Sequence, residues 1–259
     1  MADNRKIIID AGHGGAEPGA TFQGRQEKND TLRLALAVGQ ILSDSGLDVS
    51  YTRVTDVYHT PFEKAQIANM SGSDYFLSIH RNAMPIPGSG SGFESLVYQN
   101  EGVAGMMAAN INEELERTGF QNLGVIERPG LIVLRDTEMP AVLVEAGFID
   151  NEADNRFFDM NFNAIAEAIA MGILNTIRAE ETEPEYFQIQ VGAYRERANA
   201  DALLNQLLGR GLPAFLVAED GLFKVRVGAF LNMDNAARME QNLRSMGYPT
   251  VMVRARAVR

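Results

Sequence analysis

The sequence predicts an α/β domain with a mostly parallel sheet flanked by helices, followed by a small α+β domain of order βαββαβ. Two observations predict this fold class. Over residues 1–179, short apolar runs alternate with segments of helical periodicity, which implies right-handed crossovers and parallel strands. Further along the chain, the segment FQIQVGAY at 187–194 recurs as FKVRVGAF at 223–230, which marks an internal repeat.

Composition limits the classes of protein to consider. With 259 residues, 46% of them hydrophobic, the chain is long enough for two domains with buried cores. It has no cysteine, so disulfides and thiolate chemistry are excluded and any metal must be bound by nitrogen and oxygen. The net charge of −11 is uneven, since residues 1–180 carry −12 and residues 187–259 carry +4. This argues against nucleic acid as a partner, whereas the basic second part suits an anionic polymer.

The first half of the α/β domain starts with a run of three isoleucines that ends on the loop Gly12-His13-Gly14-Gly15. β-Branched residues favour a strand covered on both faces, and the glycines allow a tight turn after it. Helical periodicity and short apolar runs then predict the next elements. These are a helix over 27–45, a strand over 48–52, a helix over 61–70 and a strand over 75–80.

The second half of this domain starts with a Pro/Gly/Ser loop over residues 85–92. The same criteria predict strands and helices beyond it. They are a strand over 93–98, a helix over 102–118, strands over 131–134 and 141–145, and a largely helical segment over 155–178. The acidic stretch over 180–185 contains no apolar residue and is expected to be a linker.

The repeat places the second domain at residues 186–255. Without a gap, the same offset also aligns Gly211 with Gly247 and Pro213 with Pro249. Each copy reads as strand, helix, strand, and one copy alone could not cover its apolar face. We therefore expect the two copies to form a four-stranded sheet backed by two helices.

Three predicted strands end on reactive side chains, namely His13, His80 and Glu145. The carboxyl ends of parallel strands meet along one edge, so these side chains should converge there. Glu27 starts the first helix on the same side. Two imidazoles and one carboxylate with an open position form a possible catalytic metal site, and a further carboxylate could act as general base. From the residues alone, a structural role for the two distant histidines stays open, and His59 is expected at the surface.

Several motifs together resemble the zinc-dependent N-acetylmuramoyl-L-alanine amidases of the amidase_3 type. They are DAGHGG at 10–15, Glu27-Lys28, Thr52-Arg53, Ala68-Asn69, SIHRNA at 78–83 and LVEAGFI at 143–149. The resemblance implies that His13, Glu27 and His80 bind Zn²⁺ and that Glu145 is catalytic. It also implies cleavage between the lactyl group of muramic acid and L-alanine in peptidoglycan. The sequence departs from the usual family pattern at Ala11 and Lys64, neither of which is an expected ligand.

The repeated module resembles the SPOR domain, whose two halves carry a V-Q-x-G-[AS]-[FY]-like signature. This resemblance implies binding to peptidoglycan glycan, particularly to strands stripped of stem peptides. Its candidate contact residues are Gln190, Tyr194, Arg226 and Phe230. For the two aromatic residues, the alternative is a place in the core of the small domain.

The sequence thus leads to one main hypothesis and two alternatives. The main hypothesis is a peptidoglycan amidase, an autolysin of the kind used in wall degradation or sporulation, tethered to its substrate by the second domain. The alternatives are a catalytically inactive wall-binding protein and a zinc carboxypeptidase. The sequence has neither a signal peptide nor a run of about 18 apolar residues that could span a membrane. We therefore expect no membrane partner, and action at the cell wall either as a processed form or after release from the cytoplasm at mother-cell lysis.

Overall fold

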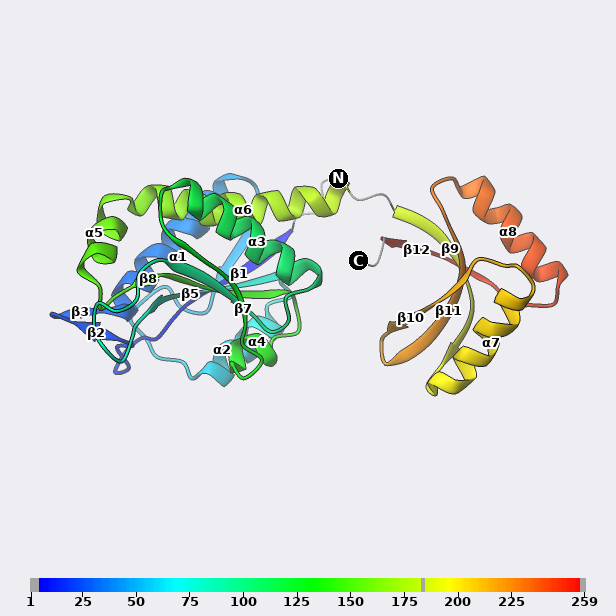
Figure 1. The fold of residues 1–259 in the computed structure, drawn as a ribbon, viewed down its shortest axis with the longest axis horizontal. Helices are drawn as coiled ribbons and strands as arrows, with labels where there is room; N and C mark the ends of the chain where they lie inside the picture. The colour runs from blue at the N-terminus through cyan, green and yellow to red at the C-terminus, as the bar shows by residue number, and fades with distance from the viewer. Residues whose placement is uncertain (1–4, 183–184, 257–259) are drawn as a thin grey trace. The chain divides into compact units, whose positions relative to one another are not determined.

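The structure is a computed structural model that describes residues 5–182 and 185–256. The chain divides into two compact units, Met1–Arg178 and Ala179–Arg259. Each unit has its own sheet and its own core (Figure 1). The two are described separately below.

The first unit is built on a six-stranded sheet of order β4-β1-β5-β8-β6-β7. All neighbouring strands are parallel except β6 and β8, which are antiparallel. The predicted mostly parallel sheet is confirmed. Its strands are β1 (Lys6–Ala11), β4 (Asp48–Tyr51), β5 (Tyr75–Asn82), β6 (Phe93–Val97), β7 (Asn122–Glu127) and β8 (Ala141–Phe148). A short hairpin, β2 (Thr21–Phe22) with β3 (Arg25–Gln26), precedes the first helix.

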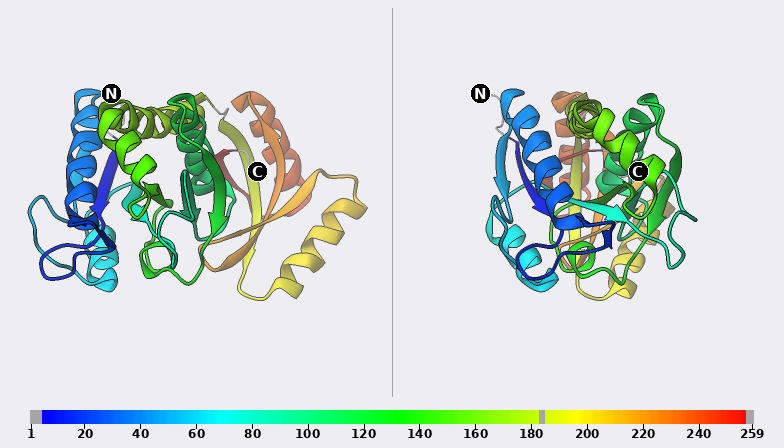
Figure 2. Two further views of the ribbon diagram at one scale, coloured as in Figure 1. Left: turned by 60° about the vertical axis from the view of Figure 1, so that its left-hand side comes forward. Right: turned by 90° about the vertical axis from the view of Figure 1, so that its left-hand side faces the viewer.

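Helices cover both faces of this sheet (Figures 1 and 2). Helices α1, α3, α5 and α6 contribute to the larger core on one face, and α2 and α4 contribute to a smaller core on the other. The helices are α1 (Glu27–Asp44), α2 (Pro61–Met70), α3 (Gly102–Arg117), α4 (Ile132–Arg135), α5 (Glu152–Met160) and α6 (Phe162–Thr182).

Strand β1 shows why the sequence folds into three layers. Side chains alternate along a strand, so Ile7 and Ile9 enter the larger core while Ile8 enters the smaller one. All three are buried, and burying such a side chain stabilises the fold by about 1.5–3 kcal/mol. Because both faces of β1 are apolar, both must be covered by other elements, as observed.

One predicted strand is wrong. Residues Leu131–Leu134 lie in and next to the one-turn helix α4, where the Leu131 carbonyl accepts hydrogen bonds from the backbone N–H groups of Leu134 and Arg135. Four apolar residues fit either a strand or one helical turn, so packing against the sheet decides between them. The strand in this region is β7, whose interior Gly124 and polar ends conceal the strand pattern.

The helix predicted over 155–178 is two helices. Asn151 caps α5 by accepting hydrogen bonds from the N–H groups of Ala153 and Asp154, and α5 ends at Met160. Helix α6 then turns away by 79° and runs to Thr182, so the first part of the predicted linker is helical. Residues 183–184 of that linker lie outside the described residues. Among the described helices none alone could span a membrane, and only the bent pair α5–α6 combines enough length and apolar composition.

The second unit has the predicted βαββαβ order. Its elements are β9 (Glu185–Tyr194), α7 (Arg197–Gly209), β10 (Ala214–Glu219), β11 (Leu222–Phe230), α8 (Met233–Ser245) and β12 (Val251–Arg256). The strands form an antiparallel sheet of order β10-β11-β9-β12, with the two repeated segments paired at its centre. Both helices cover the same face of this sheet (Figure 1), and no helix of the described residues 185–256 covers the other face.

Candidate metal centre and active-site cleft

The site starts from a row of side chains across three neighbouring strands. His80 on β5 lies directly opposite Glu145 on β8, which lies opposite Glu94 on β6. By alternation, these side chains share the sheet face of Phe76 and Leu143, which α2 and α4 cover. The strands predicted to end at His80 and Glu145 continue to Asn82 and Phe148, so the row lies in the second halves of β5 and β8. It is on the thinly covered face, where a ligand can approach.

His13 comes from the glycine-rich loop after β1 and has a left-handed backbone conformation with φ of 61°. Such a conformation in a non-glycine residue needs support from its surroundings. Buried Arg53 supplies it, because its guanidinium donates hydrogen bonds to the carbonyls of Ala11 (3.0 Å), Gly12 (2.9 Å) and Lys28 (2.9 Å). One cation thus ties the histidine loop to the first turn of α1.

Glu27 is the first residue of α1, where the helix dipole favours a carboxylate. Its two oxygens accept hydrogen bonds from the backbone N–H groups of Arg81 and Ala20, both at 2.9 Å. They also lie 3.0 Å from Nε2 of His13 and 3.0 Å from Nδ1 of His80. Burial opposes ionisation of Glu27, but these two histidines outweigh it and lower the pKa of the carboxyl group.

His13, Glu27 and His80 form a compact donor cluster. One nitrogen or oxygen atom from each lies within 4.8 Å of the others. The two imidazole rings meet edge to face with centroids 4.8 Å apart. Two nitrogens and one carboxylate oxygen at these separations are the donor set that zinc takes in catalytic sites, with a further position left for water or substrate.

Two glycines leave room for this cluster. A Cβ atom at Gly12 would lie 2.5 Å from Cε1 of His80. At Gly19, where φ is +68°, it would lie 2.6 Å from both Glu27 Oε2 and His13 Cδ2. The backbone therefore approaches all three donors more closely than any other residue type would allow, and this fits a site shaped around one ion.

Glu145 differs from Glu27 in having no partner for one of its oxygens. Oε2 of Glu145 is buried and has no hydrogen-bond partner among the described residues. Burial, reinforced by the nearby charges of Glu27 and Glu94, raises the pKa of Glu145 well above its usual value. A carboxylate of this kind beside a metal site is suited to accepting a proton.

A buried ion pair lies below the histidines. Lys64 Nζ is 2.9 Å from Asp10 Oδ1 and donates a hydrogen bond to the Ala11 carbonyl at 2.9 Å. Thr52 and Ser78 donate hydrogen bonds to the same aspartate at 2.6 and 2.7 Å. Burial alone would raise the pKa of Asp10, but Lys64 and the hydrogen bond from Thr52 lower it. Lys64 is held in place by α2, whose N-terminus has a capping box between Thr60 and Glu63.

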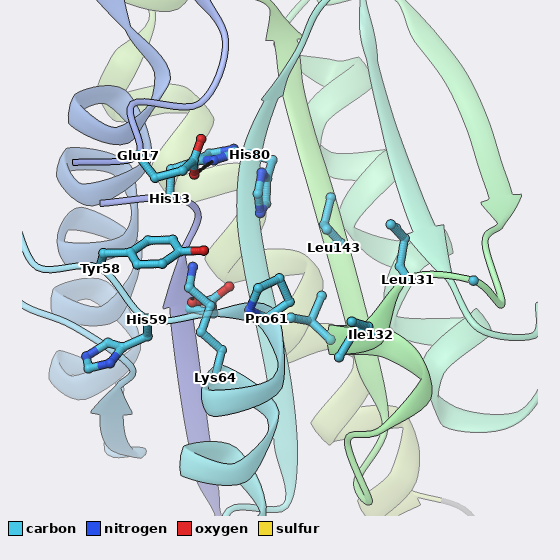
Figure 3. A pocket seen from close by; sticks show the side chains of 13 residues that line it. His13, Glu17, Tyr58, His59, Pro61, Lys64, His80, Leu131, Ile132 and Leu143 are labelled. Atoms are coloured by element: carbon cyan, nitrogen blue, oxygen red, sulfur yellow. Dashed lines mark hydrogen bonds and ion pairs between the residues drawn. The ribbon is translucent and has the colours of Figure 1, made fainter. Parts of the chain in front are cut away.

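A cleft of about 410 Å³ opens next to the donor cluster. Figure 3 shows polar side chains on one side of it, including His13, Glu17 and Tyr58, and the aliphatic side chains of Leu131, Ile132 and Leu143 on the other. His80 lies between the two sides. The aliphatic wall includes the residues of the wrongly predicted strand, so α4 brings apolar surface to the site.

The four side chains singled out from the sequence thus occupy one site, since His13, Glu27 and His80 cluster and Glu145 is the cross-strand neighbour of His80. The remaining histidine, His59, lies at the edge of the cleft. Sequence reasoning missed the contributions of Glu17, Arg53 and the Asp10–Lys64 pair. The Thr-Arg pair at 52–53 was a signal for Arg53, but its contacts with three carbonyls cannot be read from a linear pattern.

Comparisons with known proteins agree with this geometry. The family model described as N-acetylmuramoyl-L-alanine amidase matches residues 7–175. The chain belongs to this family. The amidase match includes every residue of the donor cluster together with Glu145, and a second model, the SPOR domain, matches residues 183–255.

Individual proteins similar to this chain are also N-acetylmuramoyl-L-alanine amidases. The sporulation-specific N-acetylmuramoyl-L-alanine amidase of Bacillus subtilis strain 168 is 35% identical over 222 residues, which is 83% of this chain and 85% of the relative. An amidase crystal structure from Clostridium difficile 630 aligns with a TM-score of 0.66 at 26% identity, over 69% of this chain and all of that one. The catalytic domain of CwlV from Bacillus (Paenibacillus) polymyxa aligns with a TM-score of 0.62 at 29% identity, over 67% of this chain and 98% of that one. The amidase fold is therefore shown for the first unit.

In the SPOR domain of this amidase, the four predicted glycan contacts lie in different surroundings. Tyr194 and Phe230 pack against the core of the domain, each close to the glycine two residues before it. Gln190 is half-buried and pairs with Arg226 across β9 and β11. Only Arg226 lines the groove of about 890 Å³ along this sheet.

Proposed function

We propose that the chain is a zinc-dependent N-acetylmuramoyl-L-alanine amidase in which His13, Glu27 and His80 bind Zn²⁺ and Glu145 transfers protons. The scissile bond is the amide between the lactyl group of N-acetylmuramic acid and the L-alanine of the stem peptide. The observation that carries the proposal is the convergence of three donor atoms within 4.8 Å beside Glu145, whose buried Oε2 has no hydrogen-bond partner in the described part of the chain.

Two properties of the donor cluster favour Zn²⁺ binding: the chemistry of its ligand atoms and the contacts that hold its side chains in place. Zn²⁺ prefers imidazole nitrogen and carboxylate oxygen in sites of this size, and when bound it would lower the pKa of water and neutralise developing negative charge. Glu27 is fixed by two backbone N–H groups, so its carboxylate is oriented before any ion binds. His13 is fixed by its loop and His80 by its strand.

Glu145 is the candidate general base and general acid. Its raised pKa favours taking a proton from the attacking water, and the same carboxyl group can then give that proton to the leaving nitrogen of L-alanine. This proton transfer turns the amide nitrogen into an amine that can leave. The buried Oε2 has no competing donor among the described residues, so it is free for this role.

The cleft supports a peptide substrate. Its aliphatic wall of Leu131, Ile132 and Leu143 offers surface for apolar parts of the muramoyl peptide, and its polar wall offers hydrogen-bonding groups. A free-peptide carboxypeptidase would need a cation positioned for a terminal carboxylate. Of the described residues that line this cleft, the basic one is Lys64, which already pairs with Asp10, and this favours the amidase reaction.

Metal removal and reconstitution tests the proposal. We expect a chelator to abolish the release of stem peptides from purified peptidoglycan and stoichiometric Zn²⁺ to restore it, while binding to the wall persists throughout. Unchanged peptide release from protein shown by elemental analysis to be metal-free would contradict the proposal.

We further propose that the SPOR domain binds glycan in the groove on the helix-free face of its sheet. Arg226 is buried there, donates a hydrogen bond to Gln188 and pairs with Glu219, yet its Nε has no partner among the described residues. Tyr186 and Phe215 add aromatic surface to the same groove. Hydrogen-bond donors beside aromatic surface are suited to a sugar chain.

The groove can be tested with the catalytically impaired full-length variant E145Q, which does not digest its ligand. Exchanging Arg226→Gln should weaken binding to glycan strands stripped of stem peptides by about tenfold, the size expected for a central contact. Arg238→Gln, on the exposed surface of α8, is the matched control and should bind normally. Equal glycan binding by E145Q and by its Arg226→Gln and Arg238→Gln versions would exclude the groove as the glycan-binding site.

Both domains support action at the cell wall. The similarity to a sporulation-specific amidase supports a role in spore formation, where wall material must be removed. The mildly basic SPOR domain and the acidic amidase domain differ in net charge, so the attraction to an anionic wall polymer would come from the SPOR domain.

A further inference from the structure

Glu17 lies next to the donor cluster without belonging to it. Its Oε2 contacts Nδ1 of His13, while Nε2 of the same ring lies 3.0 Å from Glu27 Oε2. The His13 ring is therefore held between two carboxylates, one at each nitrogen. Among the described residues, the converging donor atoms come from His13, Glu27 and His80, so Glu17 contacts the cluster from outside.

The loop itself fixes the position of Glu17. The backbones of Gly14 and Glu17 exchange two hydrogen bonds, of 2.9 and 3.0 Å, which close the loop into a small ring. The backbone N–H of Gly19 donates to Oε1 of Glu17 at 3.0 Å, which leaves Oε2 for His13. The carboxylate is thus oriented by residues of its own loop, and the ring orientation follows from the carboxylate.

An ion between Nε2 of His13 and Glu27 would decide which nitrogen of the ring carries the proton. A carboxylate can only accept a hydrogen bond, so a proton is needed on Nε2 toward Glu27 only while no ion lies between them, whereas the contact with Glu17 keeps a proton on Nδ1. With an ion bound, the neutral ring would present the free lone pair of Nε2 to it. Metal-binding histidines commonly have such a partner on the other nitrogen, and loss of that partner typically weakens metal affinity 10- to 100-fold.

We propose that Glu17 is a positioning residue for the metal centre, which holds the His13 ring in the tautomer and orientation that present Nε2 to the ion. This inference rests on the proposed zinc function. The side chain of Glu17 is 44% exposed, so its replacement leaves no buried hole and the fold should tolerate it. Its effect should therefore appear in metal affinity more than in stability.

The test measures Zn²⁺ affinity of the full-length, initially metal-free protein by competition with a chelating indicator. We expect Glu17→Ala to bind Zn²⁺ about 10- to 100-fold more weakly than the wild type. Glu17→Gln keeps an acceptor oxygen without the charge, so its Zn²⁺ affinity should lie between those of the wild type and Glu17→Ala. Glu167→Gln, which removes an exposed carboxylate from α6, is the charge-matched control and should bind as the wild type does.

A second readout reports the tautomer directly. In ¹⁵N-histidine-labelled, zinc-loaded protein, the His13 ring should show a protonated Nδ1 in the wild type, and Glu17→Ala should expose that proton to faster exchange with water. Thermal unfolding of the metal-free variants checks that they fold.

The outcomes separate this inference from the function on which it rests. If the wild type binds Zn²⁺ and Glu17→Ala binds it within about twofold with an unchanged Nδ1 signal, the role of Glu17 is refuted and the zinc site stands. If the wild type does not bind Zn²⁺ at all, both proposals fail.

Discussion

At the scale of single residues, Glu27 and Glu145 show how one site gives two carboxyl groups opposite properties. Glu27 is buried but accepts hydrogen bonds from two backbone N–H groups and lies against two imidazoles, so its pKa is lowered. Burial and the nearby carboxylates of Glu27 and Glu94 raise the pKa of Glu145, and its Oε2 has no hydrogen-bond partner within residues 5–182 and 185–256. The first environment suits a permanently charged ligand and the second suits a base.

Replacing Glu145 separates these roles. Glu145→Gln should lower kcat by about 10²- to 10⁴-fold, the usual contribution of a general acid–base group, with little change in KM. Zn²⁺ affinity should stay within about twofold, because Glu145 is outside the donor cluster. Steady-state kinetics on a soluble muramoyl peptide and a metal titration measure both quantities. A variant with full activity, or one that has lost its metal, would rule out the assigned role.

The Asp10–Lys64 pair predicts a pH dependence of stability. The pKa of Asp10 is lowered in the folded state from its usual 3.8, so its stabilising contribution is present above about pH 3.8 and is lost as the pH falls through the folded value. Asp10→Asn should therefore cost about 3–5 kcal/mol at pH 7, because it leaves the buried Lys64 unpaired. The difference from wild type should shrink below pH 3.8.

Urea unfolding of the metal-free proteins between pH 7 and pH 3 measures this difference. Asp48→Asn removes a carboxylate from an exposed pair with Lys6 and is the matched control, with only a small expected effect. A cost for Asp10→Asn that is the same at every pH would show that the ion pair is not its source.

At the scale of elements, β1, the glycine loop and the start of α1 form the unit that assembles the site. The strand ends at Ala11, the loop carries His13 and Glu17, and the helix begins at Glu27. Gly19 closes this unit, since only a residue without Cβ fits between the side chains of His13 and Glu27. The donor cluster is thus largely local to residues 10–27, and β5 adds His80.

Two glycines with similar φ angles test whether the donor cluster requires glycine at position 19. Gly19 and Gly24 have φ values of +68° and +81°, so replacing either by alanine strains the backbone by about 1–3 kcal/mol. An alanine at Gly19 would collide with two donors, whereas one at Gly24 has nothing within 4 Å. Gly19→Ala should therefore abolish Zn²⁺ binding and Gly24→Ala should preserve it, as measured by titration of the folded variants. Equal metal affinity in the two would contradict the close fit.

The elements also show what a sequence can and cannot predict. β1, β5 and β8 were predictable because buried strands are continuously apolar, and the ends of their apolar runs located His13, His80 and Glu145, although β5 and β8 continue to Asn82 and Phe148. The amidase motifs then supplied the roles. α4 was wrongly predicted as a strand because a short apolar run does not choose between helix and strand by itself. β7 was missed because its interior Gly124 and its polar ends conceal the strand pattern. The hydrogen bonds that hold the histidine loop in place were missed, because Arg53 donates them to backbone carbonyls that only folding brings together.

At the scale of the whole molecule, the chain joins an enzyme to a domain of a wall-binding family. An amidase that strips stem peptides produces bare glycan. We propose that the groove of the SPOR domain binds this glycan, so the enzyme would stay near the material it has processed. Tethering of this kind raises the local substrate concentration without changing the active site. The two separate cores make independent folding of the units the natural expectation.

Removing residues 183–259 tests the division of labour. The shortened protein should keep its activity on soluble muramoyl peptides within about twofold, because the donor cluster and Glu145 lie in the first unit. Its sedimentation with purified cell walls should fall to background. Loss of activity on the small substrate by a folded truncation would show that the second unit contributes to catalysis.

The chemistry of the cut is the central claim, and mass spectrometry of a peptidoglycan digest tests it most directly. With zinc-loaded wild-type protein, we predict soluble stem peptides that begin with a free L-alanine and glycan strands without new reducing ends. Glu145→Gln, as the matched control, should release almost none. Products that keep the muramoyl–alanine bond and lack a terminal residue, or no release of peptide at all, would contradict the account.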